Sequence, residues 1–396
     1  MNPSRVLVAI TLLFSNVFAA ENPKLPGIGK AMQEMIDKNE IAGVETVVVG
    51  RDRILHMEGT GYADVASKRP MTEDTVFWIA SMTKPVTAVA VMMLYDEGKL
   101  KPGDLVSKYI PEFADLKTPS GKPANLTITH ILTHTSGLGE AIGDEAKKAK
   151  TLKELVPFWV AKPTSFEPGS KWAYCQSGIN AAGRIVEVVS GISFDEFLEK
   201  RLFAPLGMKD TTFYPTEEQR KRLATAYAKK KESGELEVVA PRADFGSKDR
   251  PPQGNGGLYS TPRDYARFCQ MLLNGGSLWS KQYLSADALS FINTSQSGDI
   301  PTGFFQNDTY GNRGKNYGWG LGTCVLKEPH EGVAEVLSAG SFGHGGAWGT
   351  QAWIDPRKGV AYVLMVQRSN FPNSDASAVR RAFQKAASEA LGSNGK

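Results

Sequence analysis

The sequence has few cysteines, and their spacing builds no recognisable metal site or disulfide framework. Its 396 residues include only Cys175, Cys269 and Cys324, which lie far apart and form no Cys-x-x-Cys pair. Neither a zinc knuckle nor a small disulfide-stapled scaffold is therefore indicated, and at most one disulfide can form. We expect buried thiols in a fold that is supported by a full-sized hydrophobic core.

The sequence also lacks a strong charge imbalance. The formal net charge is +4, hydrophobic residues make up 41% and charged residues 22%, which are ordinary values for a globular enzyme. The basic runs at 147–150 and 229–231 are short and lie in polar surroundings, so they indicate solvated surface. We expect no nucleic-acid partner, and the length allows one large domain or two ordinary ones.

Long hydrophobic runs are missing, and the apolar run at the N-terminus is too short to span a bilayer as a stable helix. Residues 6–14 are apolar, follow the basic Arg5 and precede a small-residue cleavage pattern at 17–19. This predicts a signal peptide over 1–19 and an exported catalytic domain over 20–396, periplasmic or secreted. We expect no stable membrane span after cleavage, and an uncleaved membrane anchor is the alternative.

The sequence does contain a Ser-x-x-Lys pair at the start of a long apolar run. Ser81 and Lys84 precede residues 86–95, which are hydrophobic on nearly every side and therefore predict a buried helix. Gly98 supplies the helix stop. At positions i and i+3 the two polar side chains would share one face of this helix.

Such a pair can activate a serine hydroxyl, which is a poor nucleophile unless a base lies beside it. An apolar site lowers the pKa of a lysine, so Lys84 could serve as that base. The positive end of the helix also favours negative charge developing on the oxygen of Ser81. A second Ser-x-x-Lys pattern, Ser393 to Lys396, lies in a loose tail, so the pattern alone is not specific.

Two further stretches could face Ser81. Tyr174 lies just before a predicted helix, where its phenol could relay a proton beside a cationic lysine. The glycine-rich residues 343–349 could offer a backbone N–H that, with the N–H of Ser81, forms an oxyanion hole. His130 and His134 have the spacing of a helical zinc pair, but the glutamate of a His-Glu-x-x-His site is absent. We favour structural histidines that bond to nearby backbone.

The hydrophobic patterns place strands at both ends of the chain and helices in its middle. Strands are expected over 43–49, 54–61, 318–327, 343–354 and 359–366, and helices over 29–39, 86–95, 128–138, 152–160, 178–189, 193–203, 264–273 and 377–391. One compact solution is an α+β fold, with an antiparallel sheet flanked by N- and C-terminal helices (about 27–75 and 318–394) plus an all-helical lobe. A site would lie between the lobes, with Ser81 at its floor.

Taken together, these stretches resemble the serine β-lactamase and penicillin-binding protein superfamily. The nearest members are class C β-lactamases, D,D-peptidases and family VIII carboxylesterases. Residues 81–84 resemble the first motif of the family, and 174–176 stand where it has Tyr-x-Asn. Residues 344–346 stand where it has Lys-Thr-Gly or His-x-Gly, while 132–138 and 205–208 also look like family segments. The resemblance runs along nearly the whole mature chain and implies the β-lactamase/D,D-peptidase fold.

The resemblance implies acyl transfer through a covalent intermediate on Ser81, with no metal or organic cofactor. Lys84 and Tyr174 would take the serine proton and protonate the leaving group, and water activated by Tyr174 would then release the acid. The backbone N–H groups of Ser81 and Ala347 would hold the oxyanion. The residues implied in substrate binding are Gln176, His344, Gly345, Gly346 and Trp348.

Two departures from the family pattern bear on the substrate. Gln176 replaces an asparagine that in relatives contacts the substrate's amide side chain and the lysine. His344 replaces a lysine that binds the substrate's carboxylate, and a histidine is mostly uncharged at neutral pH. Both changes favour small neutral esters over anionic β-lactams or D-Ala-D-Ala ends. Trp348 could form a wall of the acyl pocket or belong to the core.

The expected function is therefore that of an exported serine hydrolase, most simply a carboxylesterase acting on small esters. The expected partner is a small-molecule substrate, which is an ester, an amide or a β-lactam. One alternative is a β-lactamase or D-alanyl-D-alanine carboxypeptidase. Another is a penicillin-binding or sensor protein that is acylated without turnover. A Ser-His-Asp hydrolase of the α/β type is disfavoured, because the chain contains no Gly-x-Ser-x-Gly elbow.

Overall fold

A computed structural model describes residues 22–240, 246–302, 316–330, 334–371 and 376–393. The predicted signal peptide over 1–19 lies outside these ranges. Within them, no helix has the length and apolar character needed to cross a membrane.

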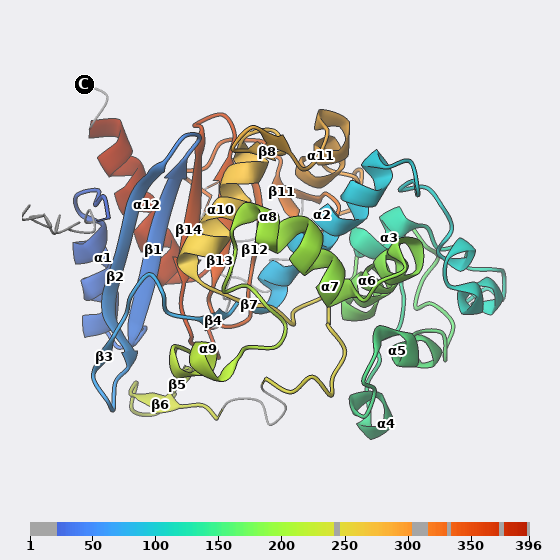
Figure 1. The fold of residues 1–396 in the computed structure, drawn as a ribbon, viewed down its shortest axis with the longest axis horizontal. Helices are drawn as coiled ribbons and strands as arrows, with labels where there is room; N and C mark the ends of the chain where they lie inside the picture. The colour runs from blue at the N-terminus through green and yellow to red at the C-terminus, as the bar shows by residue number, and fades with distance from the viewer. Residues whose placement is uncertain (1–21, 241–245, 303–315, 331–333, 372–375, 394–396) are drawn as a thin grey trace, which may run out of the picture.

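One antiparallel sheet joins the two ends of the chain, as Figure 1 shows. In the described part of the chain it has eight strands in the order β10-β11-β12-β13-β14-β1-β2-β3. These strands are β1 (Gly43–Gly50), β2 (Ile54–Asp64), β3 (Arg69–Pro70), β10 (Tyr317–Trp319), β11 (Cys324–Leu326), β12 (Phe342–Gly345), β13 (Gln351–Asp355) and β14 (Val360–Met365). N-terminal β1 pairs directly with C-terminal β14, with Val47 opposite Val363. The α+β fold with a single antiparallel sheet is confirmed.

Two of the expected strands, over 318–327 and 343–354, were wrong: each is a pair of shorter strands, because each apolar run contains a turn with a glycine. The run over 318–327 forms the hairpin of β10 and β11, and the run over 343–354 forms β12 and β13. The connecting turns include Gly322 at φ 69° and Gly349 at φ 86°, a backbone conformation that favours glycine. The turn between β12 and β13 follows the third motif, residues 344–346. This motif therefore lies at the end of β12, at one end of the sheet.

Helices cover both faces of the sheet. The terminal helices α1 (Ile28–Asp37) and α12 (Ala378–Ser393) pack together on one face, as expected. Helix α10 (Pro262–Leu273), expected in the helical middle, packs on the other face against β1 and β14. Strand β1 is accordingly buried on both sides: Val44 and Val48 join the core beneath α1 and α12, and Val47 joins the larger core.

The centre of the molecule is the helix α2 (Thr83–Asp96), which is buried from Thr83 to Leu94. Its all-round hydrophobicity fits this position, as the sequence predicted. It ends as expected at Gly98, which has φ 71°, while the N–H groups of Gly98 and Lys99 donate to carbonyls of the last turn at 2.8 and 3.0 Å.

The other helices of the middle region lie mostly around α2 and its neighbour α6. A short hairpin lies in the polar stretch that follows α9. The helices are α3 (Ile128–Leu132), α4 (Asp144–Lys147), α5 (Leu152–Trp159), α6 (Gln176–Ser190), α7 (Phe194–Leu198), α8 (Ala204–Leu206), α9 (Glu217–Lys221) and α11 (Ala286–Asn293), and the hairpin strands are β5 (Tyr227–Lys229) and β6 (Leu236–Val238). Helix α6 packs on α2 and also contacts α3, α5 and α7.

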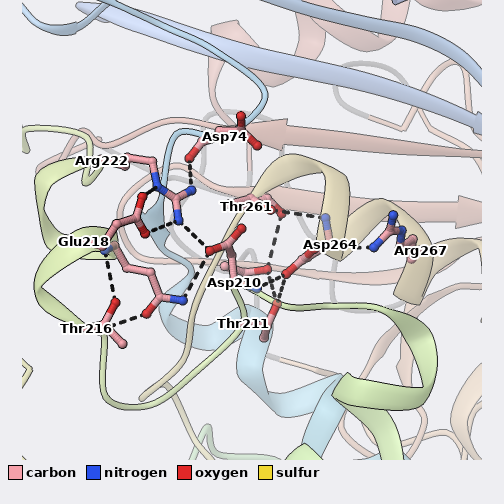
Figure 2. A network of polar contacts seen from close by, with 11 residues as sticks. Asp74, Asp210, Thr211, Thr216, Glu218, Arg222, Thr261, Asp264 and Arg267 are labelled. Atoms are coloured by element: carbon pink, nitrogen blue, oxygen red, sulfur yellow. Dashed lines mark hydrogen bonds and ion pairs between the residues drawn. The ribbon is translucent and has the colours of Figure 1, made fainter. Parts of the chain in front are cut away.

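A polar network anchors the strand that leads into the Ser81 turn (Figure 2). That strand, β4 (Phe77–Trp78), pairs with β7 (Tyr259–Ser260), and the Ser260 hydroxyl lies 2.7 Å from that of Thr211. The carboxylate of Asp264 accepts from Thr211 and from the backbone N–H of Asp210, at 3.1 and 2.7 Å. Burial raises the pKa of Asp264 to about 6.

Arg222 neutralises the acidic end of this network. Its guanidinium donates to the Asp210 carboxylate at 2.5 Å, to Glu218 at 2.8 and 2.9 Å, and to the carbonyl of Asp74 at 2.6 Å. The Asp210 residue is only 7% exposed, so this ion pair compensates a carboxylate that has lost most of its water.

We predict that Arg222→Ala lowers the free energy of unfolding by about 2 kcal/mol, because it leaves the Asp210 carboxylate buried without its cation. Urea denaturation followed by circular dichroism measures this. Lys221→Ala, which removes an exposed ion pair with Glu217, is the matched control and should change stability by less than about 0.5 kcal/mol. Equal losses in the two variants would contradict the assignment.

Candidate active site

Ser81 lies in a tight turn at the entrance to the buried helix. The turn, η1 (Ala80–Met82), is a 3₁₀ segment directly before α2, so the serine precedes the helix that was expected to carry it. The Thr83 hydroxyl fixes this turn: it donates to the Ala80 carbonyl at 2.7 Å and accepts from the N–H of Leu258 at 3.2 Å. The Ser81 side chain is only half-buried, which leaves it accessible at the positive end of α2.

Lys84 is fully buried and reaches back to Ser81. Its Nζ lies 3.0 Å from the Ser81 Oγ and 2.6 Å from the carbonyl oxygen of Asn255. The same Nζ lies 4.7 Å from the centre of the Tyr174 ring. The spacing of the first motif therefore places amine and hydroxyl in direct hydrogen-bond contact, although the serine stands outside the helix.

Asn255 was not predicted as a site residue. Its loop is tied to the serine region by two further bonds: the Thr87 hydroxyl donates to the Gly254 carbonyl, and the Trp78 indole donates to the Gly256 carbonyl, both at 2.7 Å. A Cβ at Gly254 would lie 2.8 Å from the Thr87 hydroxyl, so only glycine fits there without a shift. The glycines at 254, 256 and 257, which surround Asn255, were the available signal in the sequence.

The phenol of Tyr174 faces His344. Its oxygen lies 3.4 Å from His344 Nε2, and His344 Nδ1 lies 2.6 Å from the carbonyl oxygen of Gly345. Because a carbonyl oxygen only accepts, we assign the proton to Nδ1, which leaves the Nε2 lone pair facing the phenol. Burial lowers the pKa of His344 to about 3, and a positive charge on Lys84, when its amine is protonated, acts in the same direction. The imidazole is therefore neutral at physiological pH.

The side chain of Gln176 binds the loop that holds the lysine. Its Oε1 accepts from the Asn255 side-chain amide at 3.0 Å, and its backbone N–H donates to the carboxylate of Glu140 at 2.6 Å. Gln176 and Asn255 also line a cavity of about 740 Å³, together with Asn180 and apolar side chains of α4 and α5. The glutamine thus lies between the lysine-binding loop and a cavity large enough for a small ligand.

The third motif packs against the segment that enters the Ser81 turn. Gly345 and Gly346 are buried, and a Cβ at Gly346 would lie 2.5 Å from the carbonyl oxygen of Ile79. Ala347 follows and is exposed. Half-buried Trp348 lies with its ring 5.4 Å from that of Trp78, beside the strand leading to the serine. These contacts suit the predicted oxyanion hole, which stays a prediction.

His130 and His134 do not lie on one helix. Helix α3 ends at Leu132, and His134 has a left-handed backbone with φ 61°, so the prediction of one helix over 128–138 was wrong. Each ring accepts a backbone N–H, His130 from Thr127 at 3.2 Å and His134 from Cys175 at 3.1 Å. The expectation of structural histidines bonded to backbone is confirmed. The described residues contain no cluster of three potential metal ligands.

Comparison with known proteins points to a single family. The family model described as Beta-lactamase matches residues 28–387. Esterase EstB of Burkholderia gladioli is 29% identical, over 84% of this chain and 87% of its own. The D-alanyl-D-alanine-carboxypeptidase/endopeptidase AmpH of Escherichia coli is 30% identical, over 75% and 72%. The solved structure of EstCE1, a hydrolase with promiscuous acyltransferase activity, superposes with a TM-score of 0.74 at 22% identity, covering 91% and 97%.

We predict that the imidazole of His344 stays neutral, with its proton on Nδ1, from pH 8 down to about pH 4. Because its folded-state pKa is depressed to about 3, its contribution to folding stability is fully present above about pH 6.5 and is lost as the pH falls toward 3. Nitrogen-15 NMR of the histidine rings measures both protonation and tautomer. The urea-unfolded chain, whose histidines titrate near pH 6.5, is the control. A His344 midpoint near 6.5 in the folded protein would refute this account.

Proposed function

The chain belongs to the beta-lactamase family and is a serine hydrolase of that superfamily, and from this premise we propose that it is a carboxylesterase acting on small neutral esters. The reaction would pass through a covalent acyl intermediate on the Ser81 oxygen. The observation that carries the choice of substrate is the neutral, buried imidazole of His344, at the position where the family motif has either a lysine or a histidine.

Acylation follows from the contacts of Ser81. Its Oγ attacks the ester carbonyl carbon while its proton passes to the neutral amine of Lys84, 3.0 Å away. The N–H groups of Ser81 and Ala347 stabilise the negative oxygen of the tetrahedral intermediate. Collapse of that intermediate breaks the bond to the leaving alkoxide, which takes a proton from the phenol of Tyr174. The proton on Lys84 then passes to Tyr174 and restores its hydroxyl.

Deacylation uses the same groups. The phenol of Tyr174 passes its proton to the neutral amine of Lys84 as it takes one from a water molecule that attacks the acyl carbonyl. When the intermediate collapses, the bond to the Ser81 oxygen breaks, and that oxygen takes the proton held by Lys84. His344 Nε2 accepts a hydrogen bond from the phenol and so orients it toward the reacting atoms. No step needs a positive charge at position 344, which supports a neutral ester over a substrate with a carboxylate.

A D-alanyl-D-alanine carboxypeptidase is the second candidate. AmpH, which carries that activity in its name, is 30% identical to this chain, and the cavity beside Gln176 contains amide side chains that could bind a peptide. The neutral His344 argues against it, because position 344 then offers no cation to the carboxylate of a D-Ala-D-Ala end.

We further propose that the enzyme is exported. The support is the pattern of Arg5, the apolar residues 6–14 and the small-residue site at 17–19. Mass spectrometry of the protein expressed in a Gram-negative host tests this. A periplasmic form starting near residue 20 is expected, and a cytoplasmic form that keeps residue 1 would contradict export.

We predict that the wild-type protein hydrolyses p-nitrophenyl butyrate faster than nitrocefin or a D-Ala-D-Ala peptide. Ser81→Ala and Lys84→Ala should each lower kcat/KM for the ester by at least about a thousandfold, because each removes a partner in nucleophile activation. Ser393→Ala, in the second Ser-x-x-Lys pattern, is the matched control and should retain full activity.

Three outcomes would contradict parts of this proposal. Unchanged ester turnover in Ser81→Ala would reject the serine mechanism. Faster turnover of nitrocefin or of the peptide would leave the mechanism intact and replace the substrate class. A permanent Ser81 adduct without turnover would show a penicillin-binding or sensor protein.

A further inference from the structure

We propose that His134 is a positioning residue that holds the phenol of Tyr174 in its working orientation. It does so by accepting hydrogen bonds from the backbone N–H groups of both neighbours of Tyr174 and through one ring contact. The inference rests on the proposed role of Tyr174 in proton transfer. His134 is fully buried, lies on the segment after α3, and belongs to none of the three motifs.

The first observation is a backbone clamp around Tyr174. The carbonyl oxygen of His134 accepts from the N–H of Ala173 at 2.9 Å, and its Nδ1 accepts from the N–H of Cys175 at 3.1 Å. A single residue therefore binds both chain neighbours of the tyrosine. Fixing the main chain on each side restricts the direction in which the Tyr174 side chain leaves it.

The second observation is a ring contact on Tyr174 itself. The His134 imidazole lies 4.4 Å from the phenol ring, centroid to centroid, at an interplanar angle of 33°. Trp319 and Trp172 stand edge-on to the imidazole at 4.9 and 5.8 Å. The imidazole is thus held by two indoles, and it supports the ring whose hydroxyl lies 3.4 Å from His344.

The third observation is a strained conformation without another evident use. The backbone φ of 61° at His134 is uncommon for a residue with a Cβ, and such strain persists where the surroundings impose it. Because Nδ1 accepts a backbone N–H, the ring proton belongs on Nε2, and this buried nitrogen has no hydrogen-bond partner among the described residues. The local structure thus tolerates strain and an unpaired donor at the residue that contacts Tyr174.

The burial of His134 keeps its imidazole neutral, so that Nδ1 remains a hydrogen-bond acceptor. Burial lowers the pKa of His134 well below its usual value of 6.5, and a positive charge on Lys84, when its amine is protonated, acts in the same direction. A protonated ring would point an Nδ1–H at the N–H of Cys175 and would break the clamp. The site therefore favours the neutral imidazole of His134, and only this form can accept the hydrogen bond from the N–H of Cys175.

The test compares His134→Ala with His134→Asn. We expect His134→Ala to lower kcat for p-nitrophenyl butyrate by roughly a hundredfold, the usual cost of misplacing a catalytic group by about 1 Å, with KM within about threefold. Asparagine tolerates a left-handed backbone, and its side-chain oxygen can replace Nδ1, so His134→Asn should recover part of the loss. His130→Asn, the same change at a histidine that has no ring contact with Tyr174, should keep wild-type kcat.

A double-mutant cycle separates positioning from a general structural role. Because His134 acts through the phenol, adding His134→Asn to Tyr174→Phe should lower kcat further by less than about twofold. An equal loss in both backgrounds would overturn the proposal, and so would full activity of His134→Ala. Since the asparagine variant keeps the clamp, the test still applies if the alanine variant does not fold.

The outcome also separates this proposal from the function it rests on. If Tyr174→Phe alone keeps wild-type kcat, the proposed proton transfer has failed. A crystal structure of His134→Ala, which removes both the Nδ1 acceptor and the ring contact, then decides the positioning claim by itself. A phenol displaced from His344 Nε2 supports the claim, and an unmoved phenol refutes it.

Discussion

The contact between the buried amine of Lys84 and the Ser81 hydroxyl is the interaction on which the rest of the site depends. Removing an amine from water penalises its charged form and so favours the neutral form that can act as a base. The Asn255 carbonyl at 2.6 Å and the serine oxygen at 3.0 Å hold the buried amine in place beside the hydroxyl. Helix α2 can bury the lysine because nearly every residue around it is apolar, and the Ser81 turn at its start keeps the hydroxyl half-exposed.

The sheet completes the site by joining parts that are distant in sequence. Pairing of β1 with β14 closes the two ends of the chain, and the turn after β12 then packs on Ile79, two residues before the serine. The polar network of Asp210, Arg222 and Asp264 fixes β7, the partner of the strand that leads into Ser81. Stability and activity are therefore coupled through a few tertiary contacts near one turn.

Side-chain motifs could be found from the sequence, and backbone contributions could not. Ser81, Lys84, Tyr174 and His344 were all selected because their residue types and settings carry recognisable chemistry, and the structure places them together. Asn255 was missed because it binds the lysine through its carbonyl, which every residue possesses.

The errors in the fold have a related cause. The left-handed backbone at His134 ends helix α3 early, and turn glycines divide two expected strands. In each case tertiary contacts select a backbone conformation that the hydrophobic pattern does not specify. The strand and helix types were nonetheless predictable, because long apolar runs such as the one in α2 have few other solutions in a folded chain.

The most direct test of the central claim is rapid-quench mass spectrometry of the protein mixed with p-nitrophenyl butyrate. The account predicts that one butyryl group appears transiently on the peptide containing Ser81, and that Lys84→Ala abolishes its rapid formation. A butyryl group on another residue, or an adduct that forms equally fast in Lys84→Ala, would contradict it.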